Sequence, residues 1–304
     1  MAKTKTLNKR RQSIRSIRKI TRTMELISTA CYRGAMDRAM SAMAYTDRLT
    51  NMVRNLAGSG AEVSHPLLVE HPETNSVQLL VLTSNRGLCG GYNGGILRRA
   101  VRRWNELTGK GSAGTEQKVE NPILDVAGKR GISYFNFRKV RPTETYTQFE
   151  DKPAWDEVEK IANRYLEEYL TGKIDRLEIV YSKFFSMSKQ AVVHETLLPL
   201  TELGSGDEAK NDGTDNNLNA EYDFLPSADS ILKEIVPASF KTKLFKCFLD
   251  AAVCEQIARM VAMKAATENA DAMIQTLTMA VNRSRQSQIT GELTELIGGV
   301  EALK

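Results

Sequence analysis

The sequence predicts an α/β protein made of a long antiparallel coiled coil of its N- and C-terminal helices plus an α/β lobe. Three observations predict this organisation. Residues 238–290 contain neither glycine nor proline, which corresponds to a helix of roughly 80 Å at about 1.5 Å per residue. Residues 7–56 have the same heptad spacing of apolar side chains. Between these helices, short apolar runs alternate with helical patterns, as is typical of an α/β lobe.

The C-terminal helix has a narrow apolar seam, so it needs a long partner helix. Only the N-terminal segment offers a seam of comparable length. The chain between Gly58 and Pro226 must leave one helix and return to the other, so we expect an antiparallel pair. The seam residues are Leu249, Val253, Met260, Met263, Ala270, Ile274, Leu277 and Val281 in the C-terminal helix, and Leu7, Ile14, Ile17, Met24, Cys31, Ala35, Ala42, Tyr45, Leu49, Met52 and Leu56, widened by Ile20 and Ile27, in the N-terminal one.

The lobe, expected over residues 75–200, contains strand-turn-helix units followed by a hairpin, so we expect a Rossmann-like sheet. The last predicted helix of the lobe has Pro153 in its first turn. It ends at Gly172. The polar stretch from Gly109 to Glu120 is expected to be a loop. The predicted elements are strand 77–83, helix 96–107, strand 123–126, a short helix from 132 to 137, a helix opened by Pro153, and strands 175–185 and 190–198.

The remaining segments join the lobe to the coiled coil. Residues 201–226 are expected to form a flexible loop and connector, because Gly204–Asn219 has little to bury. Ser227 or Asp229 can cap a helix that begins at Ile231. Pro237 is expected to kink or interrupt that helix before the long rod begins. The coiled-coil shaft is therefore expected to comprise residues 1–58 and 227–304.

The net charge of +5 is modest, but basic residues are concentrated at the N-terminus, where Glu25 is the first acid. A nucleic acid, a membrane surface, a solvated helix face and an acidic protein partner are all compatible with this run, and nucleic acid is the least favoured. We interpret the run as structure and not as a targeting segment, because its heptads continue into the following helix. No apolar run reaches the ~18 residues of a membrane-spanning helix.

Few residues point to chemistry. The four cysteines have no CxxC spacing, which predicts free thiols. His65, His71 and His194 lie in two separate segments, and none pairs with a cysteine or carboxylate at ligand spacing, so we expect no metal. No cofactor or catalytic residue is predicted. Cys89 is expected to be a small buried residue.

A glycine-rich segment, Arg86–Gly95, follows the first strand and could in principle hold a phosphate with its backbone amides. Its spacing matches neither the dinucleotide fingerprint nor a P-loop, since Ile96 stands where a P-loop has lysine. We therefore interpret Gly87, Gly90 and Gly91 as a structural turn, with at least one glycine at positive φ.

Four segments carry a resemblance that covers the chain from end to end. They are Lys19–Leu26 (KITRTMEL), Arg86–Gly91 (RGLCGG), Ala258–Thr267 (ARMVAMKAAT) and Ile289–Gly299 (ITGELTELIGG). Together they resemble the γ subunits of rotary ATP synthases. Val300 stands where the family signature has alanine.

The resemblance implies a central-stalk rotor of a proton-translocating ATP synthase, without a catalytic site of its own. It implies one copy per complex, no homo-oligomer, and contacts with the α and β subunits, the ε subunit and the ring of c subunits, but none with nucleic acid. It also implies a peripheral location on the cytoplasmic side of a bacterial inner membrane. Whether the coupling ion is H⁺ or Na⁺ stays open.

The resemblance further implies two contacts with β subunits. Arg285, Gln286, Thr290 and Glu292 match the positions that hydrogen-bond a β-subunit catch loop. Arg18, Lys19, Arg22 and Met24 match a segment that faces the lower rim of the head. Two alternatives remain at this point, a nucleotide-binding enzyme and a nucleic-acid-binding protein, and measured affinity for nucleotide or salt-dependent binding of nucleic acid would distinguish them.

Overall fold

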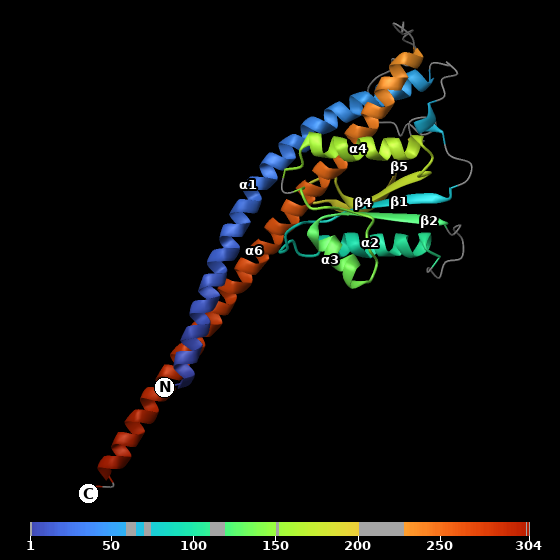
Figure 1. Cartoon of the computed structure of the whole chain (residues 1–304). Coiled ribbons are helices and arrows are strands. Elements are labelled where there is room, and N and C mark those ends of the chain that lie inside the picture. Colours follow the sequence, from blue (N-terminus) through green and yellow to red (C-terminus); the bar gives the residue numbers. More distant parts are fainter. Residues whose placement is uncertain are drawn as a thin grey trace. The chain divides into compact units, whose positions relative to one another are not determined.

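The computed structural model describes residues 2–58, 65–69, 74–109, 119–149, 152–200, 228–301 and 303. The chain forms two compact units; the main helices and strands of each are labelled in Figure 1. The first comprises Met1–Ala30, Leu88–Gly90 and Ile257–Lys304, and the second comprises Cys31–Gly87 and Gly91–Gln256. Among the described helices, none combines the length and the apolar character that crossing a bilayer requires.

The second unit contains a five-stranded sheet with the strand order β3-β2-β1-β4-β5. β1 pairs in parallel with both β2 and β4, β2 pairs in parallel with β3, and β5 is antiparallel to β4. This agrees with the predicted parallel strands and hairpin. The strands are β1 (Ser76–Leu82), β2 (Asn121–Ala127), β3 (Glu144–Tyr146), β4 (Arg176–Phe184) and β5 (Gln190–Leu198).

Helices cover both faces of this sheet (Figure 1). α2 (Tyr92–Leu107) and α3 (Lys129–Phe137) pack on one face, and α4 (Trp155–Leu170) packs on the other. The first part of α6 (Ala228–Glu301) joins α4 there, burying Phe240 and Phe248 in the same apolar cluster. A short 3₁₀ helix, η1 (Pro66–Leu68), buries Leu67 at this side.

The first unit contains a pair of antiparallel helices. It contains the beginning of α1 (Ala2–Gly58) and the end of α6. Thr4 Oγ1 lies 2.8 Å from Ser284 Oγ, and Thr21 Oγ1 lies 2.9 Å from Thr267 Oγ1. Because residue numbers rise along one helix as they fall along the other, the predicted antiparallel pairing is confirmed.

The seam on α1 differs from the predicted one. Ile17, Ile20 and Ile27 are about half exposed, whereas Thr21 and Ser28 are buried. The small side chains occupy the narrow seam, and the larger isoleucines flank it. On α6 the prediction is better, because Met263, Ala270 and Val281 are buried as expected. The lists of apolar seam residues were therefore partly wrong on α1.

Pro237 does not interrupt α6, which is helical from Ala228 onward. A proline inside a helix costs roughly 3 kcal/mol, but an apolar stripe on this segment offsets that cost. Leu232, Val236, Phe240 and Leu244 recur every four residues and are almost fully buried in the lobe core. Packing of this stripe stabilises the helix through the proline.

Three smaller predictions about the lobe also need correction. Pro153 precedes the N-cap residue Ala154 of α4 and is not in its first turn. Tyr92–Gly95 belong to the first turn of α2 and not to the loop before it. β3 has no counterpart among the predicted elements. Gly172 ends α4 with φ +71°, as predicted. The predicted connector of residues 201–226, His71 and most of the loop 109–120 lie outside the described residues.

Candidate functional site

The three glycines of the predicted turn have different roles. Gly90 has φ +55°, so the expected positive φ is found there, and the preceding Leu88 has φ +65°. A Cβ atom on Gly87 would lie 2.7 Å from Nη2 of Arg130. Gly91 is the N-cap of α2, and a Cβ atom there would meet nothing within 4 Å. Backbone geometry therefore favours glycine at Gly90, whereas a side chain at Gly87 would have to displace only the flexible end of Arg130.

The glycine under the tightest constraint is the N-cap residue of α3. Gly128 has φ +97°, and a Cβ atom there would lie 2.1 Å from the carbonyl oxygen of Thr83. The Thr83 hydroxyl also accepts a hydrogen bond from the backbone N–H of Gly131 (2.9 Å). Gly128 thus brings the end of β1 and the start of α3 into direct contact.

The crevice at which Rossmann-like sheets bind ligands is occupied by α6. Ligands in such sheets bind outside the carboxyl ends of the strands, where the strand order reverses. In this sheet that point lies between β1 and β4. The Tyr92 hydroxyl, at the start of α2, donates a hydrogen bond to the carbonyl of Ala251 on α6 (3.0 Å). Ser182, near the end of β4, shares a hydrogen bond with Cys254.

The ionisable α6 residues Cys247, Asp250 and Cys254 are buried. Burial raises the pKa of the Cys247 thiol to about 12 and that of Cys254 to about 12, so neither is a ready nucleophile. Burial also raises the pKa of Asp250 to about 6, although Lys246 and Lys183 favour its ionised form. Within the described ranges, no group of histidines, cysteines and acids could hold a metal ion, and all four cysteines are free thiols.

A buried polar network ties the sheet to α4. The Asp125 carboxylate, fully buried on β2, accepts hydrogen bonds from Gln78 (2.9 Å), Tyr165 (2.8 Å) and Arg164, and from the backbone N–H of Glu144 (3.2 Å). Burial raises the pKa of Asp125, and Arg164 opposes that rise. The network joins β1, β2, β3 and α4, so its role is to hold these elements together. Sequence analysis did not identify it.

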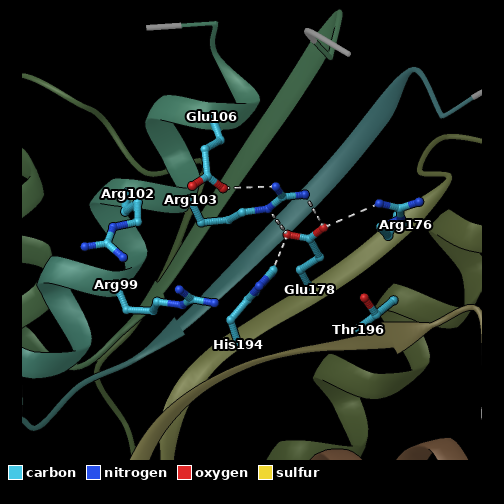
Figure 2. Close-up of a pocket in the computed structure, with 8 residues that line it drawn as sticks. All are labelled: Arg99, Arg102, Arg103, Glu106, Arg176, Glu178, His194 and Thr196. Carbon is cyan, nitrogen blue, oxygen red and sulfur yellow. Dashed lines mark hydrogen bonds and ion pairs between the residues drawn. The ribbon is translucent and has the colours of Figure 1, made fainter. Parts of the chain in front are cut away.

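A second polar cluster lies on the opposite face, where α2 crosses β4 and β5 (Figure 2). Glu178 accepts two hydrogen bonds of 2.8 Å from Arg103, and His194 Nε2 lies 2.7 Å from its Oε2 atom. Burial of the Glu178 carboxyl opposes ionisation, but hydrogen bonds from His194 and Arg103 outweigh this effect and lower its pKa to about 2. His194 thus contacts the Glu178 carboxylate through its Nε2 atom.

The residues assigned to the β-subunit catch by resemblance all lie on the exposed end of α6. Arg285 and Glu292 are two turns apart on one face, and Gln286 and Thr290 are one turn apart on a neighbouring face. All four side chains are exposed. Glu292 accepts a hydrogen bond from Gln288 (2.8 Å). These side chains contribute little to the packing of the chain itself.

The residues assigned to the lower rim lie near the start of α1. Arg18 Nε pairs with Asp271 of α6 at 2.5 Å, and Arg22 pairs with Glu25 at 2.8 Å. Lys19 is exposed, and its ammonium has no ion-pair partner among the described residues. Met24 is half-buried. Of the four, Lys19 is thus the residue whose charge is most available to another molecule.

Comparisons with known proteins give one consistent result. The family model described as ATP synthase matches residues 3–303. The chain is 58% identical over 304 residues to the ATP synthase gamma chain of Rhodopirellula baltica, covering 100% of both chains. It is 36% identical over 317 residues to the ATP synthase gamma chain of Saccharopolyspora erythraea, covering 100% of this chain and 98% of that one.

Solved structures show the same fold. A chain of the Euglena gracilis mitochondrial ATP synthase (OSCP/F1/c-ring, rotational state 3) has a TM-score of 0.64 at 18% identity, and the match covers 99% of this chain and 95% of that one. A chain of the rotor of the same enzyme, in rotational state 1, has a TM-score of 0.62 at 16% identity, covering 95% and 99%.

Proposed function

Because this chain belongs to the ATP synthase gamma chain family, we propose that it is the central-stalk rotor subunit of a proton-translocating ATP synthase. In this role it couples ion flow through the ring of c subunits to ATP synthesis or hydrolysis in the head of α and β subunits. It is present in one copy, contacts the ε subunit, and lies peripherally on the cytoplasmic side of a bacterial inner membrane.

The observation that carries the proposal is the antiparallel pairing of the two terminal helices in the first unit. Torque requires an element that is long and resists separation under load. α6 is helical over 74 residues, about 110 Å at 1.5 Å per residue, and side-chain contacts from Thr4–Ser284 to Thr21–Thr267 join it to α1. We assign residues 1–58 and 227–304 to the shaft and residues 75–200 to the lobe.

We also propose that the chain is not itself catalytic. The crevice that would bind a nucleotide in a Rossmann-like lobe contains Cys247, Asp250 and Ala251 of α6. Gly87, Gly90 and Gly91 serve the backbone path between β1 and α2, and the glycine spacing lacks the phosphate-binding fingerprint. Catalytic residues are thus expected on the partner subunits.

Two partner contacts follow from family membership and from the exposure of the residues concerned. Arg285, Gln286, Thr290 and Glu292 are proposed to hydrogen-bond a catch loop of one β subunit. Arg18, Lys19, Arg22 and Met24 are proposed to face acidic loops at the lower rim of the head. Since Arg18 and Arg22 already have acidic neighbours within the chain, Lys19 is expected to contribute most of the charge at the rim.

The proposal is tested by isolating the chain from its native membrane with an affinity tag. We expect it to co-purify with a nucleotide-binding hexamer at one copy per complex. The α and β subunits reconstituted without it should lose sustained, rotation-coupled ATPase activity, and adding the chain should restore that activity. A complex that contains two or more copies, or full coupled activity without the chain, would contradict the proposal.

A further inference from the structure

The polar cluster on the α2 face of the lobe borders a pocket to which the proposed function assigns no role. The pocket has a volume of about 400 Å³ and lies between the C-terminal half of α2 and the strands β4 and β5. Its lining is almost entirely polar or charged. The lining residues are Arg99, Arg102, Arg103, Glu106, Arg176, Glu178, His194 and Thr196.

The pocket carries an excess of positive charge. Four arginines face two carboxylates in its lining, which leaves two positive charges even if His194 is neutral. Glu178 is almost fully buried, and its oxygens are already engaged by Arg103 and His194. Glu106 accepts a hydrogen bond from Arg103 (3.1 Å). Glu178 and Glu106 thus both pair with Arg103. The excess positive charge is therefore on the other three arginines.

The other three arginines have N–H donors that are available to a ligand. Arg99 and Arg102 are exposed, and neither guanidinium has an ion-pair or hydrogen-bond partner in the part of the chain that the structure describes. Arg176 is 3.8 Å from Glu178, too far for a strong hydrogen bond. Figure 2 shows Arg99 and Arg102 on one side of the Glu178 carboxylate and Arg176 on the other. Thr196 adds a hydroxyl at the wall.

We propose that this pocket binds a small, free anion that carries a phosphate group. A guanidinium donates two parallel hydrogen bonds that match phosphate or carboxylate oxygens. A carboxylate presents its two oxygens in one plane, whereas a phosphate presents oxygens in several directions and can be held from both sides of the pocket. Arg99 and Arg102 on α2 and Arg176 on β4 provide donors from both sides. All eight lining residues are polar or charged, which disfavours a largely apolar ligand.

The buried Glu178 gives the pocket a fixed frame. Its pairing with Arg103 and His194 joins α2, β4 and β5, so the backbone positions that carry Arg99 and Arg176 are held before a ligand arrives. Pre-organisation of this kind reduces the entropy that binding costs. Glu178 and Arg103 are therefore positioning residues, and Arg99, Arg102 and Arg176 are the proposed ligand-binding residues.

The test is calorimetric titration of the full chain with inorganic phosphate and with pyrophosphate at constant ionic strength. We expect saturable binding, tighter for pyrophosphate. Replacing two charged donors, in Arg99→Gln/Arg102→Gln, should weaken it by about tenfold or more, since hydrogen bonds between charged groups are the strong ones. A control that removes the same charge elsewhere, Arg98→Gln/Arg141→Gln, should change affinity by less than about twofold, because both residues are exposed and outside the pocket lining.

Two further measurements keep the test decisive. The chain has three histidines, so the imidazole resonances of His194 should move on titration with pyrophosphate while those of His65 stay, even if the double variant folds poorly. Sedimentation with phosphatidylcholine vesicles that contain phosphatidic acid distinguishes a lipid phosphate from a free one. The absence of saturable binding, an equal loss in the control, or binding to the vesicles without binding of free anions would overturn the proposal.

Discussion

The hydroxyl of Thr267 on α6 is hydrogen-bonded to that of Thr21 on α1, with 2.9 Å between the two oxygens, and both side chains are buried. Thr267 also contacts the carbonyl of Met263 (2.8 Å), and Thr21 donates to the carbonyl of Arg18 (3.1 Å). This polar contact lies between two buried apolar residues of α6, Met263 and Ala270. It therefore fixes the register of the two helices as well as their separation.

Thr267→Val should lower the free energy of unfolding by about 1 kcal/mol, because it removes a buried hydrogen bond while keeping the shape of the side chain. Urea unfolding followed by circular dichroism measures the change. Thr21→Val combined with Thr267→Val should cost less than the sum of the two single changes, since neither hydroxyl is then left without its partner. Thr276→Val, at an exposed position of α6, serves as the control. Additive effects would show that the two hydroxyls do not interact.

Asp250 predicts a pH dependence of stability. Its pKa is about 6 in the folded chain and 3.8 ordinarily, so the folded state binds more protons between these values. Stability should therefore fall as pH rises from 3.8 to about 6. Asp250→Asn should remove this fall and raise the free energy of unfolding at pH 7 by up to about 3 kcal/mol, if the amide oxygen keeps the hydrogen bond from the Phe184 N–H.

Unfolding measured at pH 4, 5, 6 and 7 tests this prediction. The difference between Asp250→Asn and the original chain should grow between pH 4 and 6 and then stay constant. Asp37→Asn, at an exposed position of α1, should show no such trend. A variant that is less stable than the original chain at pH 7 would mean that Lys246 and Lys183 outweigh the cost of burial.

Glu178 predicts the opposite slope. Its pKa is about 2 in the folded chain and 4.5 ordinarily, so its contribution to stability is present above 4.5 and is lost as pH falls toward 2. Glu178→Gln should lower the free energy of unfolding at pH 7 by about 3 kcal/mol, because it removes the carboxylate on β4 with which the buried Arg103 forms its ion pair. Glu106→Gln, whose side chain is 34% exposed, should cost less than about 1 kcal/mol. Equal effects of both changes would contradict this account.

The proposed catch predicts an effect on the complex without an effect on the chain. Gln286→Leu or Thr290→Val should lower ATP hydrolysis and synthesis of the assembled complex by about tenfold, if a buried partner on the β subunit loses its hydrogen bond. Because both side chains are exposed in the chain, its helicity and melting temperature should not change. Gln275→Leu, at an exposed position closer to the middle of α6, is the control. Full activity of both variants at verified stoichiometry would remove the catch from the mechanism.

The lower rim is best tested at Lys19. Reversing Arg18 or Arg22 would also disturb ion pairs with Asp271 and Glu25, whereas Lys19 has no such partner among the described residues. Lys19→Glu should reduce ATP-driven proton pumping several-fold relative to ATPase rate, because a repulsive charge then faces the proposed acidic loops. Unchanged pumping at a full ATPase rate would mean that this charge is simply solvated.

The sequence predicts the elements of this chain well where the signal is long or periodic. The glycine-free stretch of α6 and the hairpin of β4 and β5 have such signals, and both are found. The three residues of β3 have no such signal, because so short a strand forms only through its pairing with β2. The helix through Pro237 depends on the burial of Phe240 and its neighbours in the lobe core, which no local pattern contains.

The charged clusters were missed for a different reason. Glu178 and Asp125 interrupt apolar strand patterns, and their main partners are far away in sequence, Arg103 at 75 residues and Arg164 at 39. A buried acid in a strand is a signal that a distant base exists, but it does not say which one. The exposed site residues, Arg285 and Gln286 among them, could be proposed only from resemblance, because an exposed polar helix end looks the same with or without a partner.

The C-terminal end of α6 affects how the chain behaves before it is assembled with its partners. Thr4, near the start of α1, already lies opposite Ser284 and Gln288, so α6 continues past the end of its partner helix. Leu293, Leu296, Ile297 and Val300 are each more than half exposed on this stretch, and an apolar surface of this kind favours self-association. A copy synthesised in excess of its partners would display that surface to chaperones and proteases, whereas an assembled copy would hide it. This exposed apolar surface would thus mark a chain without its partners for removal, which would make the cellular level of this chain follow that of its partners.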